Sequence, residues 1–230
     1  MSEAPDVAEE LLEPSQSELR RHILDMVWPV TAENVLHFLI GFVNTAMVGR
    51  LGAATILAVG LSGRVSQFVW TIFNAIGTGT TVLIARAVGA GDLLRVRRVA
   101  QQAMLLAVAL VGIVGAAVFI YAPWLLMAFK ATSDALPIGT AYLRILVFSM
   151  PFQVVFIITS AILRGSGNTR IPMLIATVTN VVIVALNSVL IFGRFGFPAL
   201  GFRGPAISTI VGQAVGAVIG LRFLVSDLSG

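Results

Sequence analysis

The segment Ala100 to Tyr121, "AQQAMLLAVALVGIVGAAVFIY", contains no charged residue and is long enough to cross a lipid bilayer as a helix. About 20 mostly apolar residues are needed to span roughly 30 Å of hydrocarbon. The whole chain has this character, because hydrophobic residues make up 57% of its 230 residues, charged residues only 11%, and its mean hydropathy is +0.96. An ordinary soluble domain carries about 25% charged residues. The composition therefore indicates an integral membrane protein.

Six segments meet the length requirement, so the predicted fold is an all-α membrane protein, a polytopic bundle of six transmembrane helices. The expected spans are Ile23–Val48, Val65–Ala87, Ala100–Tyr121, Leu136–Leu163, Ile171–Phe192 and Ala206–Val225. Connectors rich in glycine, proline and charge separate them, and such residues end helices. We expect a flexible cytoplasmic tail at 1–22, a six-helix transmembrane lobe at 23–225 and a cytoplasmic end at 226–230.

The basic residues indicate the orientation, since lysine and arginine are retained in cytoplasmic loops. The side with both termini carries nine of them and the other side five, with Arg144 left out because it falls within a span. The nine are Arg20, Arg21, Arg86, Arg95, Arg97, Arg98, Arg164, Arg170 and Arg222, and the five are Arg50, Arg64, Lys130, Arg194 and Arg203. This split predicts a multi-pass protein of the plasma (inner) membrane with both termini in the cytoplasm. The basic residues form no stripe with interleaved aromatics, so nucleic acid is not an expected partner.

The first expected span carries polar residues on one helical face. Glu33, His37 and Asn44 are separated by four and seven residues, which places them on the same side of a helix. A charge at the bilayer centre costs about 3 kcal/mol even on insertion scales, so such a residue normally faces the bundle interior or a watery cavity and marks a functional site. We predict that Glu33 lines a cleft and takes up and releases protons. His37 either relays a proton or hydrogen-bonds Glu33.

Three other expected spans carry similar polar stripes. Gln67, Asn74 and Thr78 step along one face of the second span, and Asn180 and Asn187 lie seven residues apart in the fifth. Thr209 and Gln213 lie one turn apart in the sixth. Stripes that converge from several helices predict a central aqueous cleft lined by hydrogen-bonding groups. The alternative for any single threonine or asparagine is that it only bridges neighbouring helices.

Prolines and glycines within the spans are candidate helix bends. Pro29, Pro151, Gly77 and Gly79 are the residues we expect to supply them, since sharp kinks are found at proline and glycine. Small residues in membrane helices alternatively permit close packing, and both residue types are common there.

The sequence offers no catalytic centre. It has no cysteine, and Ser166, in a glycine-rich connector, lacks a base, because the only histidines are His22 in the tail and His37 in the first span. No second carboxylate–histidine group completes a metal site with Glu33 and His37. We therefore expect no enzymatic activity, no metal and no cofactor. No ATP-binding motif is visible, so energy coupling would come from an ion gradient or from a partner.

Five stretches together resemble the amino-terminal half of a multidrug and toxic compound extrusion (MATE) transporter. They are "PVTAENVLHFLIGFVNTAMVGRLGAATILAVGL" (Pro29–Leu61), "ARAVGAGD" (Ala85–Asp92), "YLRI" (Tyr142–Ile145) with Pro151 downstream, "ILRGSGNTRIP" (Ile162–Pro172) and "LIFGRFGFPALGFRGPAIST" (Leu190–Thr209). The resemblance implies two six-helix lobes around a central cleft. It also implies alternating access and antiport, in which cationic or amphipathic drugs are exchanged for protons or sodium ions.

The sequence departs from the family pattern at its acidic positions. Asn44 and Asn187 stand where family members often carry acids, and His37 stands where they carry a glutamine. We hypothesise that Glu33 substitutes for the missing acids. The expected partners are the lipid bilayer, drug-like cations and a second six-helix lobe, either a missing carboxy-terminal half or a second copy of this chain; an incomplete lobe is the preferred interpretation.

Two other functions are consistent with a bundle of this kind. One is a flippase for lipid-linked saccharides, a related architecture that would need a strongly cationic cleft. Arg64 and Arg144 are the only candidate buried cations, which disfavours it. The other is a membrane subunit that scaffolds other proteins without transporting anything.

Overall fold

The computed structural model describes residues 52–193 and 200–229 continuously, and separate positions between 27 and 49. Most of those separate positions are helical. Glu33, His37, Asn44 and Pro29 lie outside the described residues, so the roles expected of them stay predictions.

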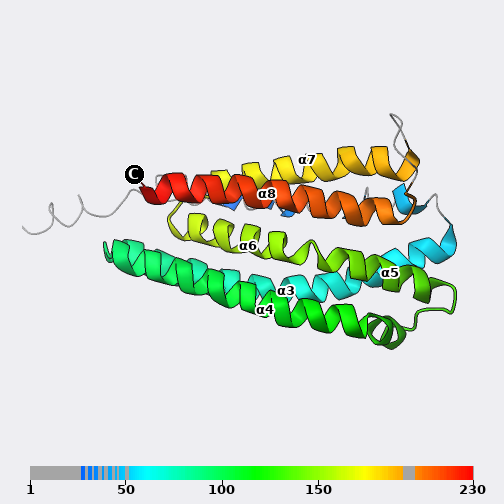
Figure 1. The fold of residues 1–230 in the computed structure, drawn as a ribbon. Coiled ribbons are helices and arrows are strands. Elements are labelled where there is room, and N and C mark those ends of the chain that lie inside the picture. The colour runs from blue at the N-terminus through cyan, green and yellow to red at the C-terminus, as the bar shows by residue number, and fades with distance from the viewer. Residues whose placement is uncertain are drawn as a thin grey trace, which may run out of the picture.

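The described chain is helical apart from short connections, and it contains no strand (Figure 1). Its helices are α3 (Ala53–Gly89), α4 (Leu93–Ala128), α5 (Ala135–Val147), α6 (Met150–Gly165), α7 (Arg170–Phe192) and α8 (Arg203–Ser229). Helices suit the bilayer because they satisfy their backbone hydrogen bonds within one segment. The predicted all-α bundle is confirmed.

Four of the described helices, α3, α4, α7 and α8, are long and apolar enough to cross a membrane. α5 and α6 together form a fifth candidate span, bent by 50° at their junction. The span predicted over Leu136–Leu163 therefore consists of two helices with a bend between them. Pro151, in the first turn of α6, has no N–H to donate, and the N–H groups of Phe148 and Ser149 bond carbonyls three residues back instead of four.

Two helices begin earlier than the sequence predicted. α3 starts at Ala53 instead of Val65, and α4 starts at Leu93 instead of Ala100. The side chain of Asp92 caps α4 by accepting the Arg95 N–H at 2.9 Å, so the basic run that follows is helical. With 37 residues, α3 is roughly 55 Å long at 1.5 Å per residue, which exceeds the hydrocarbon thickness and requires tilting or projection beyond it.

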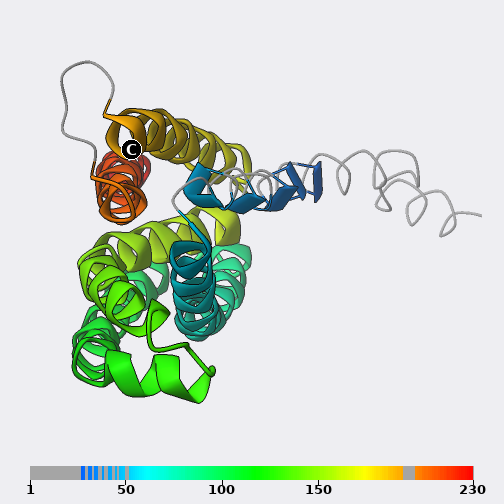
Figure 2. The ribbon, with the colours of Figure 1, turned by 90° about the vertical axis from the view of Figure 1, so that its right-hand side faces the viewer.

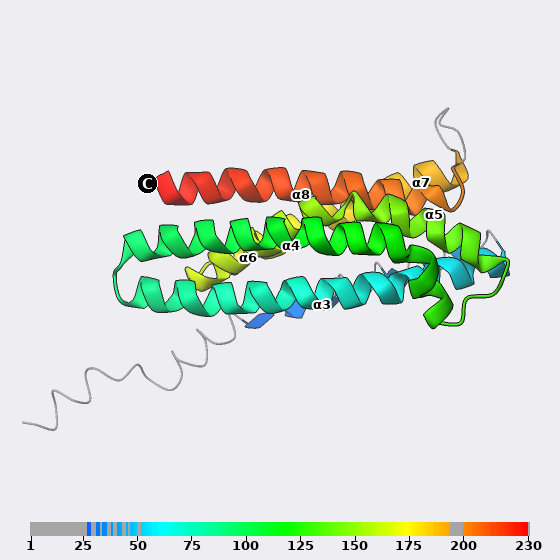
Figure 3. The same cartoon turned by 60° about the horizontal axis from the view of Figure 1, so that its bottom comes forward.

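The helices form two hairpins with a bent pair between them. α3 and α4 run antiparallel side by side, and α7 and α8 form the second hairpin (Figures 1 and 3). α6 packs against α3, α4 and α8 and joins the two groups. Seen end-on, the described positions of 27–49 lie between α3 and α7 (Figure 2).

One end of the bundle collects arginines. The α3–α4 turn, the α6–α7 turn and the carboxyl end of α8 lie at the same end of the molecule (Figure 1). Helix ends there carry Arg86, Arg95, Arg164, Arg170 and Arg222. This arrangement agrees with the shared side to which the sequence assigned them.

Close packing of the helices depends on glycines. A Cβ at Gly165 of α6 would lie 2.8 Å from the Thr81 carbonyl oxygen and 2.7 Å from Ile84 Cβ, both in α3. A Cβ at Gly77 would lie 3.0 Å from Ile157 Cγ2. Without a hydrophobic driving force between helices in lipid, such close approach is a main source of association. α3 continues through Gly77 and Gly79 without a break. Gly77 lies in a close contact with α6.

We expect Gly165→Ala to destabilise the bundle by about 1–3 kcal/mol, the usual cost of overpacking, because backbone and branched side chain leave no room for a methyl group. The measurement is the thermal midpoint of the detergent-solubilised protein, read from the monodisperse peak that survives heating. Gly112→Ala is the matched control, since a Cβ at Gly112 of α4 meets nothing within 4 Å. Equal midpoints for the two variants would contradict the packing role of Gly165.

Candidate functional site

Three adjoining cavities follow α3 along the side that faces α6, α7 and α8. Their volumes are about 340, 440 and 320 Å³, in order from the amino end of α3. The first and second share Gly41, Gly63, Ser66, Gln153 and Thr209, and the second and third share Asn34 and Trp70. We call these three adjoining cavities together the cleft.

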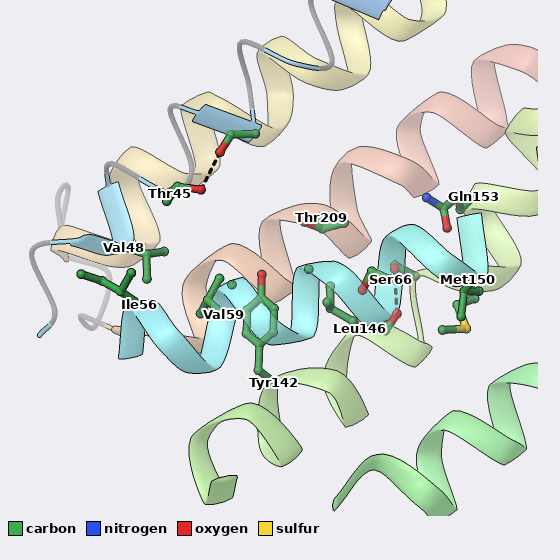
Figure 4. Close-up of a pocket in the computed structure, with 15 residues that line it drawn as sticks. Thr45, Val48, Ile56, Val59, Ser66, Tyr142, Leu146, Met150, Gln153 and Thr209 are labelled. Atoms are coloured by element: carbon green, nitrogen blue, oxygen red, sulfur yellow. Dashed lines mark hydrogen bonds between the residues drawn. The ribbon is translucent and has the colours of Figure 1, made fainter. Parts of the chain in front are cut away.

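The amino-terminal segment forms one wall of the cleft. Its described lining residues are Asn34, Phe38, Gly41, Thr45 and Val48, which recur at spacings of four, three, four and three and so share one helical face. The Thr45 hydroxyl donates to the Gly41 carbonyl oxygen at 2.8 Å (Figure 4). The described residues of this segment therefore present one helical face to the cleft.

Glu33 and His37 lie outside the described residues and adjoin two residues of this wall in the sequence. Glu33 directly precedes Asn34, and His37 directly precedes Phe38.

α3 forms the opposite wall and carries three of the polar residues that the sequence singled out. Gln67 lines the second cavity, and Asn74 and Thr78 line the third. Thr78 donates to the Asn74 carbonyl oxygen of its own helix at 3.0 Å. The Thr81 hydroxyl lies 3.1 Å both from the Gly77 carbonyl oxygen of its own helix and from the Ala161 carbonyl oxygen of α6. The second contact is the helix-bridging role considered as the alternative for such residues.

α7 and α8 close the second cavity with buried amides. Asn180 of α7 is 3% exposed and Gln213 of α8 is 7% exposed. Within the described part of the chain, Asn180 Nδ2 and Gln213 Oε1 have no hydrogen-bond partner. Both residues line the second cavity. Asn187 is fully buried in α7 and lines none of the three cavities.

Several lining residues were not singled out from the sequence. Gln153 of α6 lines the first and second cavities, and Tyr142 of α5 extends its phenol into the first (Figure 4). Ser66 lines both as well. A signal existed for Gln153, which is a lone amide in an apolar run two residues after Pro151. Tyr142 lies in "YLRI", one of the stretches that carry the family resemblance.

The cleft is polar and aromatic but nearly uncharged. Among the described lining residues Arg164 is the one charged side chain, at the edge of the third cavity. The described residues contain no group of three or more His, Cys, Asp or Glu side chains that could hold a metal ion. Such a lining can hold an amphipathic molecule through amide hydrogen bonds and through the rings of Trp70, Phe38 and Tyr142.

Residues 29–190 match the MatE family model. The chain belongs to the MATE family. The probable multidrug resistance protein NorM of Thermotoga maritima is 35% identical over 204 residues, which cover 88% of this chain and 44% of that protein. The uncharacterized transporter YisQ of Bacillus subtilis is 30% identical over 203 residues, which cover 85% and 43%.

A solved structure agrees with this assignment at the level of the fold. The crystal structure of a mutant of the Vibrio cholerae MATE transporter VcmN superposes with a TM-score of 0.86 at 24% sequence identity, covering 92% of this chain and 48% of that one. MATE proteins are integral membrane transporters and not enzymes. The chain spans about half the length of the relatives it matches.

A water-filled cleft would expose Trp70 to water-soluble quenchers, whereas tryptophans on the outside would meet lipid. Trp70 lines the cleft, whereas Trp28 and Trp124 are 72% and 73% exposed on the outside of the described structure. In a protein that keeps only Trp70, in lipid nanodiscs, we expect strong fluorescence quenching by iodide and weak quenching by brominated lipid. The matched protein that keeps only Trp124 should show the reverse order. Strong quenching of Trp70 by brominated lipid would mean that acyl chains fill the cleft.

Proposed function

We propose that this chain forms one lobe of a cation-coupled antiporter that exports cationic or amphipathic drug-like molecules across the plasma membrane by alternating access. The observation that carries the proposal is the match of residues 29–190 to the MATE family, together with the three adjoining cavities beside α3. The name of the Thermotoga maritima relative, a probable multidrug resistance protein, supports drug-like substrates.

The lining of the cleft supports substrates of this class. Neutral amides and hydroxyls offer hydrogen bonds without a fixed charge partner, and aromatic rings accept flat or cationic groups on their faces. Trp70, Tyr142 and Phe38 come from three different segments, so a ligand can find an aromatic surface at several points. A site of this kind accepts molecules of varied shape better than one built for a single charged group.

Glu33 is the proposed coupling residue. The described cleft lining contains no carboxylate, and Glu33 directly precedes Asn34, which lines the second and third cavities. In the proposed cycle the ionised carboxylate attracts a cationic drug, and proton uptake removes that charge. Drug release and proton binding then compete for one group, which is the requirement for antiport. Sodium ions are the alternative coupling species.

The junction of α5 and α6 is the proposed hinge for alternating access. The two helices meet at 50°, Pro151 follows the bend, and Gln153 and Met150 next to it line the cleft. A hinge at the boundary between two helical segments allows one part of the lobe to rotate while the other keeps its packing. Pro29, Gly77 and Gly79 stay proposed as further bends.

A second lobe is the proposed partner. Because the chain spans about half the length of its relatives, we infer that a carboxy-terminal lobe, or a second copy of this chain, completes the transport pathway. Six spans would return both proposed cytoplasmic termini to one side, so two lobes can pair about an axis normal to the membrane. The bilayer and drug-like cations are the other expected partners.

The flippase alternative is not favoured. Arg64 and Arg144, the two cations considered for a pyrophosphate headgroup, are exposed and not buried as the sequence suggested, and neither lines the cleft. Arg164 alone, among the described lining residues, supplies positive charge. The match to a transporter family likewise weighs against a subunit that only scaffolds other proteins.

The proposal is tested by export of a fluorescent lipophilic cation from proteoliposomes, driven first by a pH gradient and then by a sodium gradient. The protein is assayed alone and together with a MATE carboxy-terminal half. We expect gradient-dependent export in at least one of these conditions, and its loss in Glu33→Gln. Glu9→Gln, a carboxylate in the predicted tail, is the matched control and should export normally.

The outcomes distinguish whether one chain is sufficient, whether Glu33 couples transport and whether the protein is an antiporter. Export by the single chain would mean that two copies suffice, and export only with the added half would mean that the lobe needs an unlike partner. Export that persists in Glu33→Gln would refute the coupling role of the carboxylate. No export under any of the four conditions would refute the antiporter.

We expect Pro151→Ala to slow export while leaving the dissociation constant for the dye unchanged. An alanine at this position supplies an N–H that can donate to the Val147 carbonyl oxygen, which favours a continuous helix through the bend. Pro172→Ala is the matched control, because Pro172 lies in the first turn of α7 after an ordinary connection. A weaker dye affinity with an unchanged transport rate would indicate that Pro151 shapes the site and is not a hinge.

A further inference from the structure

A proline interrupts the hydrogen bonding of α4 near its carboxyl end. Pro123 lies inside the helix, and the carbonyl that an N–H at position 123 would bond is that of Phe119, four residues earlier. Proline has no N–H, so the Phe119 oxygen loses its helical donor. The last turns of α4 turn aside from the axis of the rest of the helix (Figures 1 and 3).

Arg144 of α5 supplies the missing donor. Its Nε donates to the Phe119 carbonyl oxygen at 3.3 Å, and its guanidinium lies over the Phe119 ring with 5.3 Å between Cζ and the ring centroid. One side chain thus contacts both the backbone and the ring of a single residue. A hydrogen bond to a charged donor is stronger than a neutral one, and a carbonyl without a donor in lipid is costly.

The opposite face of α5 lines the cleft. Tyr142 and Leu146 are buried there and line the first cavity, and they pack against Ala206 at the start of α8. Tyr142 and Arg144 are two positions apart, which is about 200° around a helix, so they point to opposite sides. The orientation of α5 on α4 therefore sets the position of Tyr142 in the cleft.

A tight contact on the same helix limits how α5 can move. A Cβ at Gly139 would lie 2.9 Å from Leu126 Cδ1 in the last turn of α4. Leu126 also joins Leu143 in a buried cluster. The α5 helix is thus held on α4 by apolar packing on the carboxyl side of Pro123 and by Arg144 on the amino side.

We propose that Arg144 is a positioning residue: by bonding the carbonyl that Pro123 leaves without a donor, it fixes the orientation of α5 and with it the Tyr142 wall of the cleft. The consequence for ligand binding rests on the proposed transport function. The positioning itself does not, because it is a property of the α4–α5 contact. The role also explains why a span tolerates an arginine that binds no acid in the described structure.

The test uses spin labels on a chain that has no native cysteine. Cysteines at Leu106, exposed on α4, and at Asp134, the N-cap of α5, report the distance between the two helices. We expect Arg144→Gln to broaden or shift the distance distribution measured by double electron–electron resonance. Arg144→Lys, which keeps a donor and a charge but not the planar stacking group, should restore part of the original distribution. An unchanged distribution in Arg144→Gln would overturn the proposal.

A double-mutant cycle with Pro123→Ala tests the stated cause. An alanine at position 123 provides the N–H that the Phe119 oxygen lacks, so the loss of Arg144 should lower the thermal midpoint less in that background than in the parent. Equal effects in both backgrounds would show that Arg144 acts independently of Pro123 and would refute the mechanism. Arg64→Gln, at an exposed arginine of α3, is the control for loss of one positive charge.

Dye binding supplies the readout that a purely structural role would not change. With Trp70 as the reporter in the cleft, we expect Arg144→Gln to raise the dissociation constant of the lipophilic cation about fivefold, the effect of one lost hydrogen bond. Arg64→Gln should leave it unchanged. Unchanged affinity in Arg144→Gln would refute the link to the cleft. No dye binding by the parent would count against the transport proposal, while the distance and stability measurements would still decide the positioning role.

Discussion

The need to satisfy every backbone polar group without water is the constraint on which the rest of this protein depends. In hydrocarbon only helices and closed barrels meet it, and this chain meets it with helices throughout its described spans. The two places where the regular helical hydrogen bonding is interrupted follow the same rule. Where Pro123 removes an N–H, Arg144 donates to the Phe119 oxygen in its place, and at the α5–α6 bend, Ser149 donates its N–H and its hydroxyl to the Leu146 oxygen.

Helices that satisfy their own backbone hydrogen bonds must still be held together, and in lipid there is little hydrophobic driving force for their association. Close packing at glycines takes its place in this bundle. Gly165 packs against Ile84, Gly139 packs against Leu126, and Gly212 and Gly216 of α8 pack against α7. Not every glycine has this role, because a Cβ at Gly63 of α3 would meet nothing within 4 Å, and Gly63 lines the first and second cavities. Small residues thus allow close helix contacts at some positions and line the cleft at others.

Much of the architecture could be predicted because hydrophobic length has a direct physical meaning in a bilayer. The boundaries were harder, since Gly60 and Arg64 signal a connector and yet lie within α3. Among the candidate site residues, Gln67, Asn74, Thr78 and Asn180 line the cleft. Periodicity can identify such a stripe on one helix, but it cannot say which stripes meet. Asn187 has the same periodicity and is buried away from the cavities.

The sequence by itself determined that the protein lies in a lipid bilayer, that it is helical and which family it belongs to, because composition, span length and motif order are properties of the chain alone. Only the tertiary structure decided which faces enclose space. It brought Tyr142 and Gln153 into the cleft and set Arg144 against Phe119, 25 residues away. The physical reason is that a helix presents all its faces to something, and whether a face meets lipid, another helix or a cavity depends on neighbours that are distant in sequence.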